Sequence, residues 1–374
     1  MSERLSPEKI KIGVIFGGRS GEHAVSLMSA KFVLAQLAPE KYEITQIGIT
    51  RDGRWFTGEN TLDALLAEDF SHLNPVFILP EPGGEGLYAL DGSAKLNLLT
   101  DLDVVFPVLH GTFGEDGTLQ GLLEMADLAY VGPGVTGSAV GMDKAIFADV
   151  MRANQIPVVD TILVLRSEIE SGMDAVLERV ETLGEYPYFV KPCNLGSSVG
   201  ISKVKNRSDL LEGLMDAAGY DRRLIVQKGH NVREIEVSVL GNDQPIASVP
   251  GEVLPGEEFY SYDAKYHDES SLTVIPADIP AEMAEKIRRL AVKAFKACDL
   301  AGLSRVDFFI DKDNGSIFIN ELNTIPGFTE ISMYPMLWQA SGIDNHELVD
   351  RLVELALERK AQRDATNRTF RRSN

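Results

Sequence analysis

The sequence RVDFFIDKDNGSIFINELN at residues 305–323 predicts two strands joined by a tight turn. Neighbouring side chains in a strand point to opposite faces, so every second residue shares a face. Arg305 and Asp307 therefore share one face of the first strand, and Glu321 and Asn323 share one face of the second. The geometry of the turn decides whether these two pairs meet.

The tripeptide Asp-Asn-Gly at 313–315 suits a three-residue loop, in which a type I turn is followed by a left-handed glycine. That loop pairs Lys312 with Ser316 and places Asp307 opposite Glu321. A two-residue Asn-Gly loop would shift the pairing by one residue and separate the two acids between the faces. We prefer the first register, which brings the two carboxylates together.

The preferred register gathers two carboxylates and one amide oxygen on one face, from Asp307, Glu321 and Asn323. Mg²⁺ prefers oxygen ligands and is usually held by one or two carboxylates together with substrate phosphates. An isolated pair of strand acids is more often solvent-facing. Apolar neighbours and the turn Thr-Ile-Pro-Gly at 324–327 favour a fixed, partly buried site, so we predict a metal site here.

A loop of small residues, GSSVG at 196–200, follows the apolar strand that contains Lys191. Backbone N–H groups can approach phosphate oxygens closely in such a loop. It lacks the G-x-x-x-x-G-K-[ST] pattern of a Walker-type site, and taken alone it fits a plain hairpin turn equally well. The chain also supplies the cations that a polyphosphate needs, namely Lys144, Lys191, Lys228, Lys265 and Arg305.

Two further motifs follow predicted strands in the first third of the chain. GGRSGE at 17–22 precedes a helical pattern and places Glu22 in the first turn, where the helix dipole stabilises an acid. Its GGxxG spacing differs from the dinucleotide-binding pattern GxGxxG. HGTFGEDG at 110–117 begins with His110 at the end of an apolar strand, where α/β sheets place ligands. A simple helix-start acid and a structural histidine are the alternatives to functional roles.

Apolar periodicity predicts an open α/β layer near the N-terminus and more α/β units after it. We expect a boundary at the turn cluster 132–134, a helix from there through Lys144 to about Asn154, and a frayed polar tail from Glu358 on. The other predicted elements are strands at 11–16, 42–49, 102–109, 223–228 and 234–240, a strand-loop-strand unit at 186–204, a helix at 281–297 and a mobile loop at 255–270.

Composition limits the functions that the chain can have. It has 374 residues, too many for one ordinary core, and 44% of them are hydrophobic, as in a globular protein. No apolar run reaches the roughly 20 residues of a membrane helix, and the N-terminus lacks a signal core, so we expect a cytoplasmic protein. The net charge of −20 disfavours nucleic acid and membranes as partners. Cys193 and Cys298 form no disulfide scaffold or CxxC metal motif.

Taken in order, these motifs resemble those of the D-alanine–D-alanine ligases. The two signature-like blocks are HGTFGEDGTLQG at 110–121 and RVDFF to INELNTIPG between 305 and 327. Further matching blocks are GGRSGE at 17–22, MDK at 142–144, VKPCNLGSSVG at 190–200 and YDAKY at 262–266. The resemblance covers about residues 11–345.

The resemblance implies an α/β (α+β) fold with the three-domain ATP-grasp architecture, in which ATP binds between the second and third domains. The implied domains are an N-terminal open α/β substrate domain at 1–132, a central ATP-grasp subdomain at 133–231, and a C-terminal ATP-grasp domain at 232–374 that carries the metal site and a lid loop.

The resemblance also implies the reaction. ATP phosphorylates the carboxylate of a first D-alanine, and the amine of a second D-alanine attacks the acyl phosphate. Phosphate then leaves the tetrahedral intermediate, which gives D-alanyl-D-alanine for peptidoglycan precursor synthesis. Positioning and charge neutralisation dominate such phosphoryl transfers, and a closed lid protects the acyl phosphate from water. The implied cofactors are ATP and two Mg²⁺ ions, with Mn²⁺ as a substitute.

The matched positions imply roles for individual residues. Asp307, Glu321 and Asn323 resemble the metal ligands, and Arg305 and the Gly327 amide resemble groups that stabilise an oxyanion. Glu22 resembles the residue that binds the first substrate's ammonium group, and with Ser197 and Tyr266 it matches a trio that closes the lid. The positions implied to contact ATP are Lys144, Lys191, Ser198, Lys228, Glu234 and Phe259, with Lys228 near adenine and Glu234 at the ribose. Those implied to contact the amino-acid substrates are His110, Lys265 and Ser332.

The sequence leaves alternatives open. Gln227 stands where many relatives have Glu, which leaves the adenine hydrogen bonds undefined. The nearest alternative activity is a D-alanine–D-lactate or D-alanine–D-serine ligase, and Tyr266 argues against the lactate type. A nucleotide-binding regulator on an inactive ligase fold would have lost a metal ligand or the lid motif, which are all present. An NAD(P)-dependent oxidoreductase rests only on the early glycine turn. A homodimer is implied by the resemblance alone.

Overall fold

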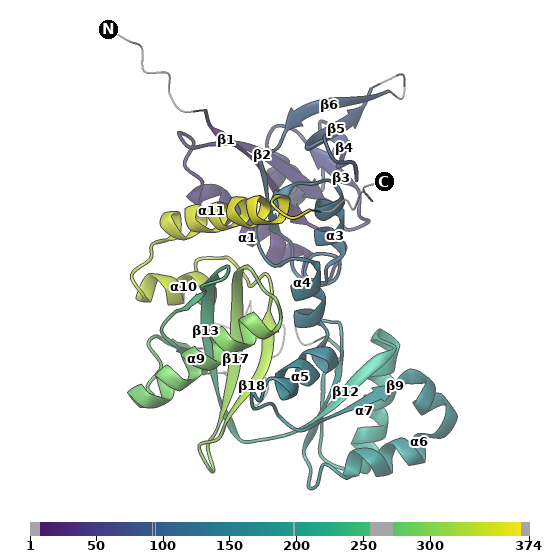
Figure 1. Ribbon diagram of the computed structural model, residues 1–374. Helices are drawn as coiled ribbons and strands as arrows, with labels where there is room; N and C mark the ends of the chain where they lie inside the picture. The colour runs from purple at the N-terminus through teal and green to yellow at the C-terminus, as the bar shows by residue number, and fades with distance from the viewer. Residues whose placement is uncertain (1–7, 92, 94, 197–198, 255–271, 368–374) are drawn as a thin grey trace, which may run out of the picture.

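The computed structural model describes residues 8–91, 93, 95–196, 199–254 and 272–367. Its main strands form three sheets, one in the upper part of Figure 1 and two below it. The predicted mixed α/β class with several units is therefore confirmed. The predicted loop at 255–270 lies outside the described residues.

The first sheet has the strand order β6-β5-β4-β3-β2-β1-β7-β8. Its β2, β1, β7 and β8 run parallel, so their carboxyl ends meet at one edge of the sheet. The motif at 17–22 follows β1 and the motif at 110–117 follows β7, so both lie at this edge. The strands are β1 (Ile10–Gly17), β2 (Tyr42–Ile49), β3 (Trp55–Thr57), β4 (Asn74–Phe77), β5 (Gly86–Leu90), β6 (Leu96–Asp101), β7 (Val104–Val108) and β8 (Ala129–Tyr130). The helices between them are α1 (His23–Gln36), α2 (Thr61–Ala67) and α3 (Thr118–Met125).

The last described helix, α11 (Asn345–Asp364), packs against this first sheet although it follows the third sheet in the chain (Figure 1). Its Leu348, Val349, Leu352 and Val353 share a hydrophobic cluster with β1 and β7. Near its end, Arg363 donates hydrogen bonds to Glu124 and Asp127. The predicted fraying from Glu358 on is wrong as far as Asp364, because these charged contacts hold the last turns against the N-terminal unit.

Two short helices, α4 (Val135–Met142) and α5 (Lys144–Ala153), connect the first sheet to the second. The single helix predicted to run through Lys144 is broken at Asp143, whose backbone is extended. The Asp143 carboxylate accepts hydrogen bonds from the N–H groups of Ala145 and Ile146 and so caps the second helix. The break starts a new helix at Lys144 and fixes the base of that lysine.

The second sheet has the order β11-β10-β12-β9 and carries helices α6 (Arg166–Glu181) and α7 (Arg207–Tyr220), which pack into one apolar cluster with it. Its strands are β9 (Thr161–Leu165), β10 (Tyr188–Pro192), β11 (Ser202–Val204) and β12 (Arg223–Lys228). The predicted strand-loop-strand unit at 186–204 is confirmed as the antiparallel pair β10 and β11.

The third sheet has the order β16-β15-β13-β17-β18, with β14 paired to β13. The apolar face of helix α9 (Ala281–Ala297) packs on it, and helix α10 (Met333–Ala340) follows its last strand. The strands are β13 (Val232–Gly241), β14 (Ile246–Ala247), β15 (Gly251–Leu254), β16 (Leu272–Val274), β17 (Gly302–Asp311) and β18 (Ile317–Asn323).

The β17–β18 hairpin has the predicted pairing but not the predicted turn. Asp307 lies opposite Glu321, as expected. The turn, however, pairs Asp311 with Ser316 through a backbone hydrogen bond, so Lys312 belongs to the loop. A bulge between Ile319 and Glu321 then shifts the register by one residue. The extra residue Asn320 compensates for the longer loop, because a bulge restores the face that a one-residue slip would reverse.

Candidate functional site

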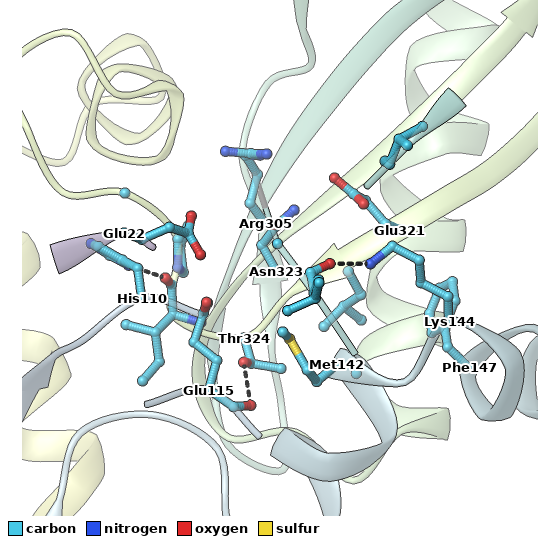
Figure 2. A pocket seen from close by; sticks show the side chains of 18 residues that line it. Glu22, His110, Glu115, Met142, Lys144, Phe147, Arg305, Glu321, Asn323 and Thr324 are labelled. Atoms are coloured by element: carbon cyan, nitrogen blue, oxygen red, sulfur yellow. Dashed lines mark hydrogen bonds between the residues drawn. The ribbon is translucent and has the colours of Figure 1, made fainter. Parts of the chain in front are cut away.

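A cleft lies where the first sheet, the α4–α5 connection and the third sheet meet (Figure 2). Figure 2 shows Glu22, His110 and Glu115 on one side, Glu321 and Lys144 on the other, and Arg305 and Asn323 between them. The predicted site residues that line it are Glu22, His110, Lys144, Arg305, Glu321, Asn323 and Gly327. A smaller hollow next to it is lined by Lys144, Lys191, Gln227 and Glu321, among others. Residues from three separate units therefore converge on one site.

Three carboxylates form a row across neighbouring strands of the third sheet. Glu236 on β13 lies opposite Asp307 on β17, which lies opposite Glu321 on β18. Directly paired residues of antiparallel strands have side chains on the same face. The row is therefore one acidic surface, and Glu321 is its member at the cleft.

Arg305 is the cation of this row. Its Nε and Nη2 donate to the two oxygens of Asp307, both at 2.7 Å, and its Nε is also 2.9 Å from Glu236. Burial lowers the pKa of Arg305, but the charges of Asp307 and Glu236 outweigh burial and hold the pKa well above its ordinary value. The guanidinium is therefore permanently charged at the cleft, where it can stabilise negative charge.

The residues of the row fit a divalent cation that is shared with phosphate. Asn323 donates from Nδ2 to Asp307 at 2.9 Å, which leaves its amide oxygen as an acceptor. In the described part of the chain, no cluster of three or more His, Cys, Asp or Glu side chains could hold a metal ion by itself. Two carboxylates and one amide make an incomplete ligand set, of the kind that Mg²⁺ completes with phosphate oxygens and water.

Two lysines reach the site, one from a helix and one from a strand. Lys144, at the start of α5, donates to the carbonyl oxygen of Leu195 at 2.6 Å, and Lys191 on β10 donates to Gln227 at 2.7 Å. Both line the smaller hollow beside Glu321. Lys228 donates to the carbonyl of Leu183, and among the described residues it lines neither hollow.

His110 connects the first sheet to the loop that follows β18. Its Nδ1 lies 2.9 Å from the carbonyl oxygen of Ile325, which can only accept, so Nδ1 carries the hydrogen. Its Nε2 lies 2.9 Å from the hydroxyl of Ser29, which in turn accepts from the N–H of Phe328. Burial lowers the pKa of His110, which agrees with a neutral ring. Both nitrogens contact protein atoms, so this geometry favours positioning of the 325–328 loop over a direct substrate contact.

Glu22 lies between two glycines that belong to different units. A Cβ atom on Gly196 would lie 2.7 Å from the Glu22 carboxylate, and one on Gly111 would lie 2.5 Å from it. Such distances are far shorter than real carbon–oxygen contacts, so only glycine leaves room for the carboxylate. The first motif, the HG motif and the start of the small-residue loop therefore meet at Glu22.

The loop after β18 brings Gly327 close to Ser332. A Cβ on Gly327 would lie 3.1 Å from the Ser332 hydroxyl, which accepts from the N–H of Thr329 at 3.0 Å.

The other predicted site residues lie elsewhere. Glu234 is on β13, two residues before Glu236 and opposite Phe309. Five predicted site residues lie outside the described residues: Ser197, Ser198, Phe259, Lys265 and Tyr266.

Glu115 is a site residue that the sequence did not single out. Its carboxylate accepts from the N–H of Gly111 at 2.5 Å and from the N–H of Ile325 at 3.2 Å. Burial, reinforced by the charge of Glu22, raises the pKa of Glu115 to about 8. Its position in the HG motif was the available signal, but only the fold reveals that it connects two loops of the cleft.

Glu115→Gln is expected to flatten the pH dependence of stability. The folded pKa of about 8 lies above the unfolded value of 4.5, so the folded state binds more protons between these values. The stability that this group contributes therefore falls as pH rises through that window, by on the order of a few kcal/mol. Glutamine does not titrate and so removes this pH dependence, although its amide nitrogen cannot accept the hydrogen bond that one of the two carboxylate oxygens accepts. Thermal unfolding midpoints of both proteins from pH 5 to 8.5 test this, and parallel curves would contradict it.

Among the described residues, no helix is long and apolar enough to span a lipid bilayer.

Comparison with known proteins places these features in a family. The model of the D-ala D-ala ligase N-terminus matches residues 11–133, and that of the C-terminus matches residues 150–354. The D-alanine–D-alanine ligase of Heliobacterium modesticaldum is 50% identical, over 96% of this chain and 98% of the relative. That of Natranaerobius thermophilus is 46% identical, over 98% of this chain and 100% of the relative.

Solved structures give the same result for the fold. The D-alanine-D-alanine ligase from Coxiella burnetii superposes with a TM-score of 0.81 at 37% identity, and each chain is covered to 96%. The VanG D-Ala:D-Ser ligase from Enterococcus faecalis superposes with a TM-score of 0.83 at 35% identity, covering 93% of this chain and 100% of that one. The fold with its three sheets is therefore shared with ligases.

Proposed function

Because this chain belongs to the D-alanine–D-alanine ligase family, we propose that it joins two D-alanine molecules with the energy of ATP. The reaction runs through D-alanyl phosphate, releases ADP and phosphate, and supplies D-alanyl-D-alanine for peptidoglycan precursors. One observation carries the proposal for this chain: Arg305 and Asn323 lie between Glu22 on one side of the cleft and Glu321 and Lys144 on the other (Figure 2), and Asp307 is paired with Glu321.

The phosphate side of the reaction is assigned to the third sheet and its neighbours. Asp307, Glu321 and Asn323 would hold the divalent cations, and we propose two Mg²⁺ ions, which Mn²⁺ can replace. Such ions neutralise phosphate charge and orient the phosphates. Lys144 and Lys191 face the same hollow and would contact the phosphates of ATP. The remaining ATP contacts are assigned to Ser198, Lys228, Glu234 and Phe259.

The amino-acid side is assigned to the cleft between the first and third sheets. Glu22 would bind the ammonium group of the first D-alanine, and Arg305 with the Gly327 amide would stabilise the oxyanion of the tetrahedral intermediate. Ser332, which lies beside Gly327, and Lys265 would contact the second substrate's carboxylate and the transferred phosphate. His110 would hold the 325–328 loop in place for these contacts.

Water must be kept away from an acyl phosphate, since hydrolysis would waste it. We propose that a lid fills this role, and that Glu22, Ser197 and Tyr266 would close it. We further propose that the chain has three domains, at 1–132, 133–231 and 232–374, that it forms a homodimer, and that it is located in the cytoplasm.

Phosphate release from ATP, measured with and without D-alanine, tests the proposed activity. Release should require both D-alanine and a divalent cation, and D-alanyl-D-alanine should be the product. Release that is indifferent to D-alanine would contradict the proposal. D-lactate and D-serine offered as second substrates test the alternative, because a relative of similar fold is named a D-Ala:D-Ser ligase.

Gly196→Ala is expected to weaken binding of the first D-alanine without unfolding the protein. The new methyl group would lie 2.7 Å from the Glu22 carboxylate, which can move because it ends a flexible side chain. Displacing a charge-assisted hydrogen bond costs about 1.5–3 kcal/mol, so KM for D-alanine should rise roughly 10-fold or more. Steady-state kinetics measure this, with thermal unfolding as a check on folding.

Gly21→Ala is the matched control for that experiment. It adds the same methyl group next to Glu22 in the chain, where a Cβ would meet no described atom within 4 Å. An equal rise in KM in both variants would mean that the Gly196 contact with Glu22 is not the cause.

A further inference from the structure

Glu236 is a buried acid that neither the sequence motifs nor the assigned roles explain. It lies on β13, opposite Asp307, and its side chain is 10% exposed. Within the described part of the chain it is not among the residues that line the cleft. Its Oε2 is 2.9 Å from the Nε of Arg305. Among the described residues, Arg305 connects Glu236 to the cleft.

A purely structural role does not account for this acid well. Asp307 already meets Arg305 with two hydrogen bonds of 2.7 Å, which is the geometry of a complete ion pair. The third carboxylate then lies directly beside Asp307 in the strand pairing, and like charges in that position repel. With three acids and one guanidinium, the row Glu236, Asp307 and Glu321 has surplus negative charge, which suits a surface that receives further cations.

The hydrogen bonds of Arg305 show a conflict that Glu236 can resolve. Both oxygens of Asp307 are bonded to the guanidinium, and one of them also accepts from Asn323. A divalent cation that binds Asp307 must compete with Arg305 for these oxygens. The Nε of Arg305 already lies between two carboxylates, 2.7 Å from Asp307 and 2.9 Å from Glu236. It can therefore exchange one partner for the other with little movement.

We propose that Glu236 is a positioning residue, which holds Arg305 at the cleft while Asp307 turns its oxygens to the divalent cation. The proposal rests on the proposed function for the reaction it serves. In this arrangement Arg305 keeps its place for an oxyanion, and Asp307 becomes available as a ligand. Without Glu236, Asp307 is the one described carboxylate that still forms an ion pair with Arg305, so the guanidinium and the metal ion compete for its oxygens.

Glu236→Gln tests the proposal by metal binding as well as by turnover. Electron paramagnetic resonance measures free Mn²⁺ in the presence of ADP and so gives the protein's affinity for Mn²⁺. We expect this affinity to be about 10-fold or more lower in Glu236→Gln than in the parent protein. In turnover, kcat should fall roughly 10- to 100-fold, whereas KM for ATP and D-alanine should stay within about 3-fold. An affinity for Mn²⁺ and a kcat both within about 2-fold of the parent would overturn the proposal.

Glu252→Gln is the matched control. Glu252 is also a buried acid of the third sheet, and it pairs with Arg233 through hydrogen bonds of 2.7 and 2.6 Å, a closer pairing than the single 2.9 Å contact of Glu236 with Arg305. It is paired with Ile235, so it lies on the opposite face of the same sheet from Glu236. Equal losses of Mn²⁺ affinity in the two variants would indicate a general loss of buried ion pairs and would also overturn the proposal.

A double variant separates an effect through Arg305 from a direct one. In an Arg305→Lys background, adding Glu236→Gln should reduce kcat by less than about 2-fold, because coupled residues are not additive. A full further loss would contradict action through Arg305. If Glu236→Gln does not fold, Glu236→Asp keeps the charge with a shorter reach, and its Mn²⁺ affinity should lie below that of the parent. The Mn²⁺ measurement needs no turnover, so a failure of the proposed ligase activity is recognised separately.

Discussion

Glu321→Gln should reduce D-alanine-dependent phosphate release by about 10³-fold or more, since several kcal/mol of charge stabilisation depend on the metal site. The amide keeps the size of the side chain but lacks the negative charge that a divalent cation requires. Glu321 is also the acid of the row that lines both the cleft and the adjoining hollow, so no described neighbour replaces it. Single-turnover and steady-state release of phosphate measure the loss.

Asp313→Asn is the control for Glu321→Gln. It removes a carboxylate from the exposed turn of the same hairpin, far along both strands from Glu321. Its activity should stay within about 2-fold of the parent, as is usual for surface substitutions. If Glu321→Gln keeps more than about a tenth of the parent activity, the assignment of Glu321 as a metal ligand fails.

Arg305→Lys should lower kcat by roughly 10²–10³-fold, the range found when one group that stabilises an oxyanion is removed. Lysine keeps the charge but not the planar fork, and Arg305 uses that fork to contact Asp307 and Glu236 together. A single ammonium group cannot maintain both contacts and also point at the cleft. The loss should appear in kcat more than in KM, because the oxyanion exists only along the reaction.

Arg233→Lys provides the comparison for Arg305→Lys. Arg233 forms the same forked contact with Glu252, on the other face of the sheet. Its kcat should remain close to that of the parent, while thermal unfolding reports any general cost of losing a forked pair. Equal losses of kcat in both variants would contradict a specific role for Arg305.

Elements with a strong local pattern could be predicted from the sequence alone. The strand at 42–49 and the helix at 281–297 have the predicted bounds, because apolar periodicity and turn residues define them locally. The break at Asp143 and the extent of α11 could not be predicted in this way. The first depends on a cap formed only when Asp143 adopts an extended backbone, and the second on contacts with a sheet far away in the chain.

The β17–β18 hairpin has the predicted pairing of its two acids but a different turn. Asp307 lies opposite Glu321, yet the loop is longer than predicted, and the extra residue Asn320 compensates. Bulges leave little trace in a sequence, since any residue can occupy them unless a glycine is required. The register was predicted from the turn residues, and the pairing of the two acids holds because the bulge offsets the longer loop.

The sequence predicted the site residues that belong to motifs. It missed two single residues that connect segments far apart in the chain. Glu22, Lys144 and Arg305 came from motifs, and the fold brings them to one cleft. Glu115 and Glu236 instead act between segments that are far apart in the chain, Glu115 on Ile325 and Glu236 on Arg305. A second acid two residues after Glu234, within the strand at 232–241, was the local signal for Glu236.

A crystal structure of the protein with ADP, phosphate and Mn²⁺ tests whether Asp307 and Glu321 form the metal site, because anomalous scattering locates the metal ions. We expect metal ions that are bound by the carboxylates of both Asp307 and Glu321. We also expect that Arg305 remains beside Glu236. Metal ions bound to the nucleotide without either carboxylate would show that Asp307 and Glu321 are not the metal ligands.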